Sequence, residues 1–119
     1  IRRMVRDLDV PVEIAACPTV REPDGLAMSS RNSRLNAAQR ADAPRIHQAL
    51  SSAALLTTPA EILAAARAAI EGSPLARIDY LALVDAATLQ PLAALDGSPA
   101  ILATAVFYGE VRLIDHVTC

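Results

Sequence analysis

Two β-favouring runs near the end of the chain are separated by only two residues. Residues 101–108 (ILATAVFY) and 111–117 (VRLIDHV) flank the dipeptide Gly109-Glu110. A two-residue connection that begins with Gly is typical of a tight hairpin turn, because Gly readily adopts the positive φ that such a turn needs. A hairpin sets the register of its strands, so these residues predict an antiparallel pair. Residues 78–84 (IDYLALV) have the same character and predict a third strand.

The segment from residue 58 to residue 72 carries the start and stop signals of a helix. Thr58 stands where an N-cap is expected, Pro59 follows at the first helical position, and Glu61 closes a capping box. Gly72 is a typical C-terminal stop. The apolar residues between these signals recur at helical spacing and predict one buried stripe. They are Ile62, Leu63, Ala66 and Ile70.

A second helical segment begins at residue 36 and contains a proline. Asn36 and Gln39 have the spacing of a capping box. Pro44 follows within two turns, and a proline inside a helix removes a hydrogen bond and clashes with the preceding turn. The sequence therefore predicts a kink or break near residues 41–43, after which the helix resumes to about Leu56.

The first 17 residues have the pattern expected at the end of a different structural domain. Ile1, Met4, Val5 and Leu8 have helical spacing, and residues 12–17 are β-favouring, which predicts a helix followed by a strand, as in half of a βαβ unit. Cys17 at the end of this strand is predicted to be a small core residue. Because the chain opens within this pattern and without Met, we expect it to be part of a longer protein.

Composition excludes several classes of protein. The chain is 53% hydrophobic with a formal net charge of −2, which excludes a disordered tail. Only 3% of its residues are aromatic and no basic footprint exists, so nucleic acid is an unexpected partner. No apolar run has the length of a membrane span, no signal peptide is visible, and two cysteines make no disulfide framework. We expect a cytoplasmic protein, without membrane contact or a metal site of its own.

These patterns together predict an α+β fold. We expect a small antiparallel sheet of about three strands, packed with two to three helices and preceded by the last helix and strand of an α/β domain. Residues 1–17 would belong to that preceding domain, residues 18–35 would form a loop and hinge, and residues 36–119 would form the compact α+β unit.

The loop, PTVREPDGLAMSSRNSRL, has neither helical nor strand periodicity, apart from one irregular turn expected at residues 29–33. Gly25 allows unusual backbone angles, Ser29 and Ser30 offer hydroxyls and free amides, and Arg31 offers a fork that can hold two oxygens. This chemistry suits a polyphosphate. A solvated turn is the alternative interpretation from the residues alone.

The string PTVREPDGLAMSSRN closely resembles the signature of the pantothenate synthetases, ligases that join pantoate to β-alanine through a pantoyl adenylate. Residues 78–85 and 111–115 resemble the C-terminal strands of the same family. The resemblance covers essentially the whole chain and implies the carboxyl-terminal portion of such an enzyme. It also implies that the preceding domain is Rossmann-like and that residues 36–119 form a lid.

The resemblance further implies roles for individual residues. Met28, Ser29, Ser30 and Arg31 would hold the phosphates of ATP, with Ser29, Ser30 and Arg31 taking part in catalysis, and Val20 would offer a backbone contact to the adenine. Arg21, Asp24 and Gly25 would shape the loop. The implied cosubstrate is ATP with Mg²⁺, the substrates are pantoate and β-alanine, and the complete enzyme would be a homodimer. The family's His-x-Gly-His motif, its phosphate-contacting Lys and its pantoate-binding Gln residues would precede Ile1, so we expect this chain alone to be inactive.

The remaining polar residues favour structural roles. His47 is expected to be a surface or half-buried helix residue, His116 to be structural, and Arg112 to be an ion-pair partner on the sheet surface. Three aspartates near strand ends should cap or pair with Arg; they are Asp79, Asp85 and Asp115. A non-catalytic binding or oligomerisation module that keeps the fold is the alternative to a ligase. The intact Met28–Asn32 segment favours the ligase.

Overall fold

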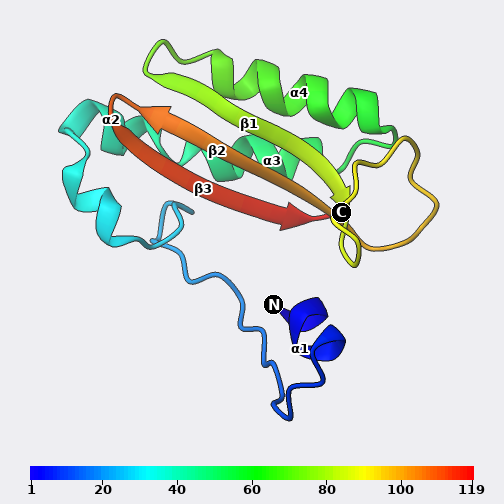
Figure 1. Cartoon of the computed structure of the whole chain (residues 1–119). Helices are drawn as coiled ribbons and strands as arrows, with labels where there is room; N and C mark the ends of the chain where they lie inside the picture. The colour runs from blue at the N-terminus through cyan, green and yellow to red at the C-terminus, as the bar shows by residue number, and fades with distance from the viewer.

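A three-stranded antiparallel sheet forms the centre of the protein. The computed structural model describes all 119 residues, and the sheet has the order β1-β2-β3 (Figure 1). Its strands are β1 (Ala76–Asp85), β2 (Ala100–Tyr108) and β3 (Val111–Thr118). Gly109 turns the hairpin between β2 and β3 with a φ of +60°. The three predicted strands and their hairpin are confirmed, with small extensions at the strand ends.

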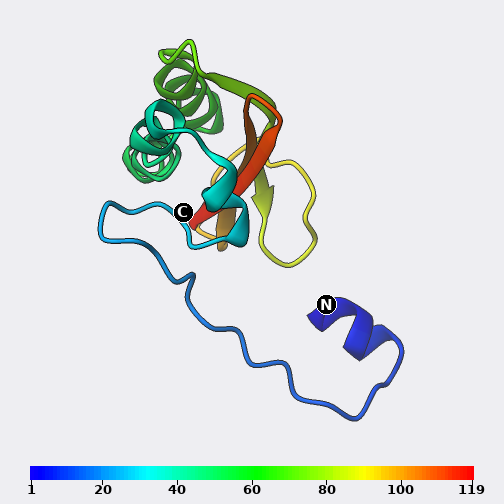
Figure 2. The same cartoon turned by 90° about the vertical axis from the view of Figure 1, so that its left-hand side faces the viewer.

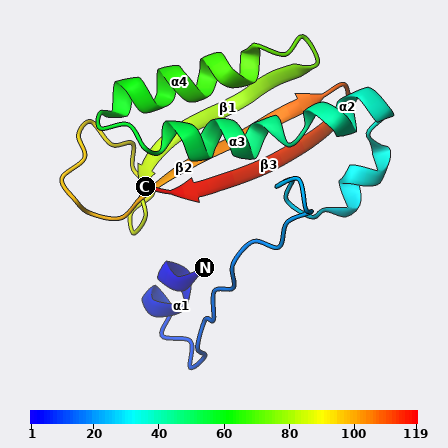
Figure 3. The ribbon, with the colours of Figure 1, turned by 180° about the vertical axis from the view of Figure 1, so that it is seen from behind.

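Two helices cover one face of this sheet, so the predicted α+β class is confirmed. Seen from the edge and from behind, α3 and α4 lie side by side on the same face (Figure 2, Figure 3). The helices of this unit are α2 (Ala37–Asp42), α3 (Arg45–Ala53) and α4 (Pro59–Glu71). Neither these helices nor the short one near the N-terminus is long and apolar enough to cross a membrane.

The core lies between the two helices and the inner face of the sheet. Leu102 and Val106 of β2 are fully buried in one cluster with Ile46 of α3 and Ile62 of α4. The predicted stripe of α4 is buried at Ile62, Ala66 and Ile70, whereas Leu63 is half-buried at its edge. Burial of these branched side chains is the main favourable contribution to the fold, about 1.5–3 kcal/mol for each large one.

The helix that begins after Asn36 is broken at the predicted place. Both hydrogen bonds of the capping box form, from Gln39 N to Asn36 Oδ1 at 2.9 Å and from Asn36 N to Gln39 Oε1 at 3.0 Å. α2 ends at Asp42, and Pro44 then occupies the N-cap position of α3 with a φ of −57°, which matches the angle that its ring imposes. α3 ends at Ala53, earlier than predicted, because the chain tightens into a turn in which Leu56 N donates to Ala53 O.

The N-terminal segment stands apart from the sheet. The predicted helix is present as α1 (Arg2–Asp7), with no buried residue (Figure 1). The prediction of a strand at residues 12–17 is wrong for this structure, because the segment pairs with no other strand and a strand exists only where a neighbour completes its hydrogen bonds. The predicted burial of Cys17 is wrong for the same reason, since nothing packs over this exposed thiol.

A buried hydrogen bond joins the corner between α2 and α3 to the sheet. The hydroxyl of the fully buried Tyr108 donates to Asp42 Oδ2 at 2.9 Å, and Arg45 Nε donates to Asp42 Oδ1 at 3.1 Å. Burial alone would raise the pKa of Asp42, but hydrogen bonds from Ser73, Tyr108 and Arg45 outweigh it and hold that pKa below its ordinary 3.8. Asp42 is therefore an ionised acceptor that stabilises the corner.

The cap of α4 gives a direct test of the helix start. Thr58 Oγ1 accepts from Glu61 N at 3.3 Å, while the Glu61 carboxylate accepts from the Thr58 hydroxyl at 2.8 Å rather than from a backbone amide, so the box is not closed as predicted. Thr58→Ala should lower the free energy of unfolding by about 1 kcal/mol. Urea denaturation measures this, with Thr57→Ala as the matched control because Thr57 is the neighbouring threonine and caps no helix. Equal midpoints for the two variants would mean that the cap contributes nothing.

The Asp42 contact predicts a pH-dependent stability. Because the pKa of Asp42 is lowered on folding, its contribution is complete above the ordinary value of 3.8 and is lost as the pH falls through the lower folded value. Tyr108→Phe removes one donor, so the difference in unfolding free energy between wild type and variant should be largest near neutral pH and should shrink below about pH 4. Denaturant titrations at about pH 7 and pH 3 measure both differences. A difference that is the same at both pH values would contradict this account.

Candidate active site

The loop that the sequence marks as irregular contains a small hairpin, residues 20–28, which we call the loop hairpin. Met28 N donates to Val20 O at 3.0 Å and Glu22 N donates to Leu26 O at 2.8 Å. Gly25 stands at its tip with a φ of +93°, which favours glycine. Leu26 is 4% exposed and belongs to the hydrophobic core, so the hairpin is packed against the α+β unit.

The chain leaves the loop hairpin through Met28 and Ser29 and enters a short 3₁₀ helix, η1 (Ser30–Arg34), where the irregular turn was predicted. Ser29 Oγ accepts from Arg31 N at 3.2 Å. The backbone amides of Ser29 and Ser30 donate no hydrogen bond within the protein. Two neighbouring amides are therefore available to a ligand.

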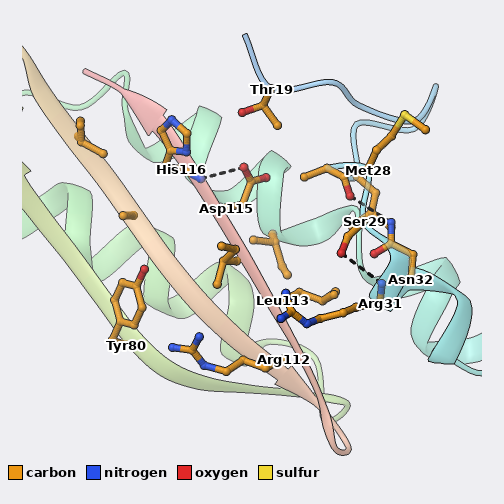
Figure 4. A pocket seen from close by; sticks show the side chains of 16 residues that line it. Thr19, Met28, Ser29, Arg31, Asn32, Tyr80, Arg112, Leu113, Asp115 and His116 are labelled. Atoms are coloured by element: carbon orange, nitrogen blue, oxygen red, sulfur yellow. Dashed lines mark hydrogen bonds between the residues drawn. The ribbon is translucent and has the colours of Figure 1, made fainter. Parts of the chain in front are cut away.

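A cavity of about 550 Å³ opens beside β3, between this loop and the sheet (Figure 4). The loop side of its wall consists of Thr19, Leu26, Ala27, Met28, Ser29, Arg31 and Asn32. The remaining wall consists of Ile46, Tyr80, Ile101, Ala103, Arg112, Leu113, Ile114, Asp115 and His116. The cavity is therefore shared between the loop of residues 18–35 and the sheet, with Ile46 added from α3.

Three of the five residues that the family resemblance assigns to ATP line this cavity. Met28, Ser29 and Arg31 are in its wall, and Figure 4 shows Arg31 reaching from the loop toward β3. Ser30 and Val20 lie outside the wall and are exposed, Val20 by 67%. The structure thus brings Ser29 and the Arg31 guanidinium to one wall and leaves the Ser30 side chain outside it.

Arg31 carries the only uncompensated formal charge in the wall. Its guanidinium makes no ion pair and no side-chain hydrogen bond. Arg112, which also lines the cavity, is paired with Asp79 at 2.7 Å, and Asp115 is paired with Arg21 at 2.7 Å. An anion that enters the cavity therefore meets one free guanidinium.

The sheet side of the cavity was not predicted as part of a site. Tyr80, Arg112 and His116 line it from the outer face of the sheet. The signal that could have found them is the alternation along β3, which places Arg112, Ile114 and His116 on one face. The predicted ion pair of Arg112 is confirmed, but the same residue is also a wall residue.

The predictions for the three aspartates and for His47 are confirmed at the level of their contacts. Asp79 and Asp115 pair with Arg112 and Arg21, and Asp85 Oδ1 caps a turn by accepting from Thr88 N at 2.6 Å. The side chain of His47 is half-buried at 28% exposure and lies 3.8 Å from Asp115, Nδ1 to Oδ2. These aspartates therefore accept hydrogen bonds that hold the fold and the loop.

One further feature of the wall concerns the side chain of Asn32. Asn32 Nδ2 donates to Ala27 O at 3.0 Å, while Asn32 Oδ1 is buried without a partner. Such an orphan acceptor costs about 1–3 kcal/mol, so a donor brought by a ligand would be stabilising there.

No group of three or more His, Cys, Asp or Glu side chains could hold a metal ion. At the loop hairpin, the hydrogen bond from Arg40 holds the pKa of Asp24 below its ordinary value.

Comparison with known proteins identifies the family. The family model described as Pantoate-beta-alanine ligase matches residues 1–118. The pantothenate synthetase of Chloroflexus aurantiacus is 48% identical over 98% of this chain, and that of Thermobifida fusca is 50% identical over 98%. The crystal structure of pantothenate synthetase from Thermus thermophilus superposes with a TM-score of 0.86 at 44% identity, over 98% of this chain and 43% of that one.

The chain spans less than half of these relatives, 43% of the Chloroflexus protein and 42% of the Thermobifida protein. The predicted correspondence with a carboxyl-terminal portion is confirmed. On the match of the family model and on these identities, the chain belongs to the pantoate-beta-alanine ligase family.

Proposed function

We propose that this chain is the carboxyl-terminal part of an ATP-dependent ligase that condenses pantoate with β-alanine. The reaction proceeds through a pantoyl adenylate and releases AMP and pyrophosphate. The observation that carries the proposal is the unpaired Arg31 guanidinium in the cavity wall, next to the free amides of Ser29 and Ser30, in a chain of this family. We call residues 28–31 the phosphate segment.

The phosphate segment suits the charge that develops in adenylate formation. When the pantoate carboxylate attacks the α-phosphorus, negative charge grows on the phosphate oxygens and on the departing pyrophosphate. A guanidinium held near those oxygens stabilises this charge, and two amides add hydrogen bonds that need no rearrangement. Arg31 and the Ser29 and Ser30 amides would stabilise this negative charge, and Ser29 also lines the same cavity.

Val20 would meet the adenine through its backbone. Its carbonyl already accepts from Met28 N at 3.0 Å, and its own N–H donates to no group of the protein. The N–H is therefore the backbone group that is left for an acceptor nitrogen of the base. Met28 lies across the hairpin stem from Val20, and its exposed side chain offers apolar contact.

Mg²⁺ would arrive with ATP as part of the substrate. The only carboxylate in the cavity wall is Asp115, and both of its oxygens accept from Arg21. The wall thus offers no free carboxylate ligand to the cation, which the phosphate oxygens of ATP would hold. The chain's own contribution is the positive charge of Arg31.

The domain division supports the same proposal. Residues 1–17 contain no buried residue, as expected if they complete a Rossmann-like domain. Residues 18–35 would be the hinge that carries the phosphate segment, and residues 36–119 would be the lid. We propose a cytoplasmic enzyme that acts as a homodimer; the free thiols of Cys17 and Cys119 are in keeping with a reducing compartment.

Arg31→Ala tests the phosphate segment. The enzyme for this test is a chimera in which the chain replaces the matching part of the Thermus thermophilus enzyme. We expect adenylate formation, measured as pantoate-dependent exchange of pyrophosphate into ATP, to slow by the equivalent of about 2–4 kcal/mol. Arg34→Ala is the matched control, because Arg34 lies in the same 3₁₀ helix but outside the cavity wall. Exchange at the wild-type rate in Arg31→Ala would remove Arg31 from the mechanism.

The isolated chain provides a second test. Adenylation needs pantoate and the α-phosphorus to be held together, and this alignment contributes several orders of magnitude to the rate. If the other half of the site lies in the preceding domain, residues 1–119 alone should catalyse no pantoate-dependent pyrophosphate exchange, and the chimera should. Robust exchange by the isolated chain would contradict the divided site. Absence of exchange in both proteins would favour the non-catalytic module.

A further inference from the structure

We propose that Asp115 is a positioning residue for the phosphate segment. Acting through Arg21, it holds the loop hairpin on β3 and thereby determines where Met28, Ser29 and Arg31 meet the cavity. This inference rests on the proposed function, because it assumes that the phosphate segment binds ATP. It assigns Asp115 no contact with the reacting atoms.

The Asp115 carboxylate is buried on β3. Its side chain is 5% exposed, and it forms two parallel bonds with Arg21, Nη1 to Oδ2 at 2.7 Å and Nη2 to Oδ1 at 2.9 Å. His116 N donates to the same Oδ1 at 2.8 Å (Figure 4). A buried carboxylate without a cation is strongly destabilising. Arg21 is the cation that hydrogen-bonds to this carboxylate, whereas His47 Nδ1 lies 3.8 Å from Oδ2, so the carboxylate favours keeping Arg21 on β3.

Arg21 also holds the loop hairpin from within. Its Nη1 donates to Gly25 O at 3.1 Å, across the hairpin from its own backbone. One guanidinium therefore joins the last strand to both the stem and the tip of the loop hairpin. Arg21 and Asp115 are 94 residues apart in sequence, so their contact determines tertiary position rather than local conformation.

Two further contacts come from the helices. Asp24 forms an ion pair with Arg40 of α2, and this pair is more exposed than the pair between Arg21 and Asp115. A Cβ on Gly25 would lie 3.1 Å from Cδ2 of His47, so the imidazole ring of this α3 residue packs directly against the hairpin tip. The hairpin thus rests on β3, α2 and α3, and the bidentate pair at Asp115 is the more buried of its two ion pairs.

The phosphate segment depends on this support because it continues directly from the hairpin. Met28 ends the hairpin stem, where its amide bonds to Val20 O, and Ser29 and Arg31 follow without another tertiary ion pair. Their placement therefore depends on the hairpin on one side and on the contacts of η1 with β3 on the other, and no ion pair within the segment replaces the hairpin's anchor. Displacement of a charge-stabilising group by about 1 Å can cost about a hundredfold in rate.

Asp115→Asn in the Thermus chimera is the test, with two measurements. Hydrogen exchange should become at least about tenfold faster at the amides of Glu22 and Met28, which bond within the hairpin, and should be unchanged in α4. In steady-state kinetics, the KM for ATP should rise about tenfold and the rate of pyrophosphate exchange into ATP should fall. The KM for pantoate should stay within about twofold. A general loss of folding would not separate the two KM values.

Control variants separate positioning from stability. Glu71→Gln removes a carboxylate from an exposed ion pair on α4, and Ile62→Val lowers stability in the core without touching the loop. Both should leave the two KM values unchanged. Arg21→Lys keeps the positive charge but loses the two parallel hydrogen bonds, so it should raise the KM for ATP less than Asp115→Asn does. It replaces Asp115→Asn as the test if that variant does not fold.

Different results would reject the positioning role and the function on which it rests. Unchanged hydrogen exchange at Glu22 and Met28 in both Asp115→Asn and Arg21→Lys would overturn the anchor. Faster exchange with an unchanged KM for ATP would show that the hairpin is anchored but that its position is irrelevant to ATP, which also overturns the proposal. Absence of activity in the wild-type chimera would instead reject the proposed function. The hydrogen-exchange data would still decide whether Asp115 holds the hairpin.

Discussion

The register of the hairpin between β2 and β3 determines how the rest of the structure is arranged. The turn at Gly109 pairs Tyr108 with Val111, and every later pair follows, including Thr104 with Asp115. With this register, Leu113 and Asp115 are buried, while Arg112 and His116 are exposed on the opposite face. A slip of one residue would exchange these faces and would remove Asp115 from its place opposite Arg21. The register therefore controls core packing and loop placement together.

The cavity combines two kinds of wall with different physical properties. The sheet supplies a rigid surface whose charged groups are already paired, as in Arg112 with Asp79. The loop supplies unpaired donors, the Arg31 guanidinium and the Ser29 and Ser30 amides, which are free to bind an anion. Because free donors are useful only if their position is maintained, the buried pair between Asp115 and Arg21 gives the exposed segment the fixed base that it requires.

Local signals in the sequence predicted the elements well, because each signal acts over a few residues. The hairpin turn, the Asn36 capping box and the break before Pro44 are all found where their chemistry indicates. The strand at residues 12–17 was wrong, because a β-favouring run forms a strand only with a partner, and local composition does not reveal one. The assignment of residues 28–31 to phosphate comes from a family signature and stays a prediction. No local signal indicated the sheet wall at Tyr80 and Arg112, because that wall depends on contacts between residues far apart in sequence.

The separation of 94 residues between Arg21 and Asp115 has a consequence for biosynthesis. A ribosome makes the loop before β3, so the loop hairpin lacks its partner on β3 while α2, α3, α4, β1 and β2 are being made. Long-range contacts of this kind form late, because the intervening chain must be ordered before the two ends meet. The loop can therefore reach its final position only after β3 has been synthesised, and until then a nascent chain would carry residues 28–31 without a defined place for them.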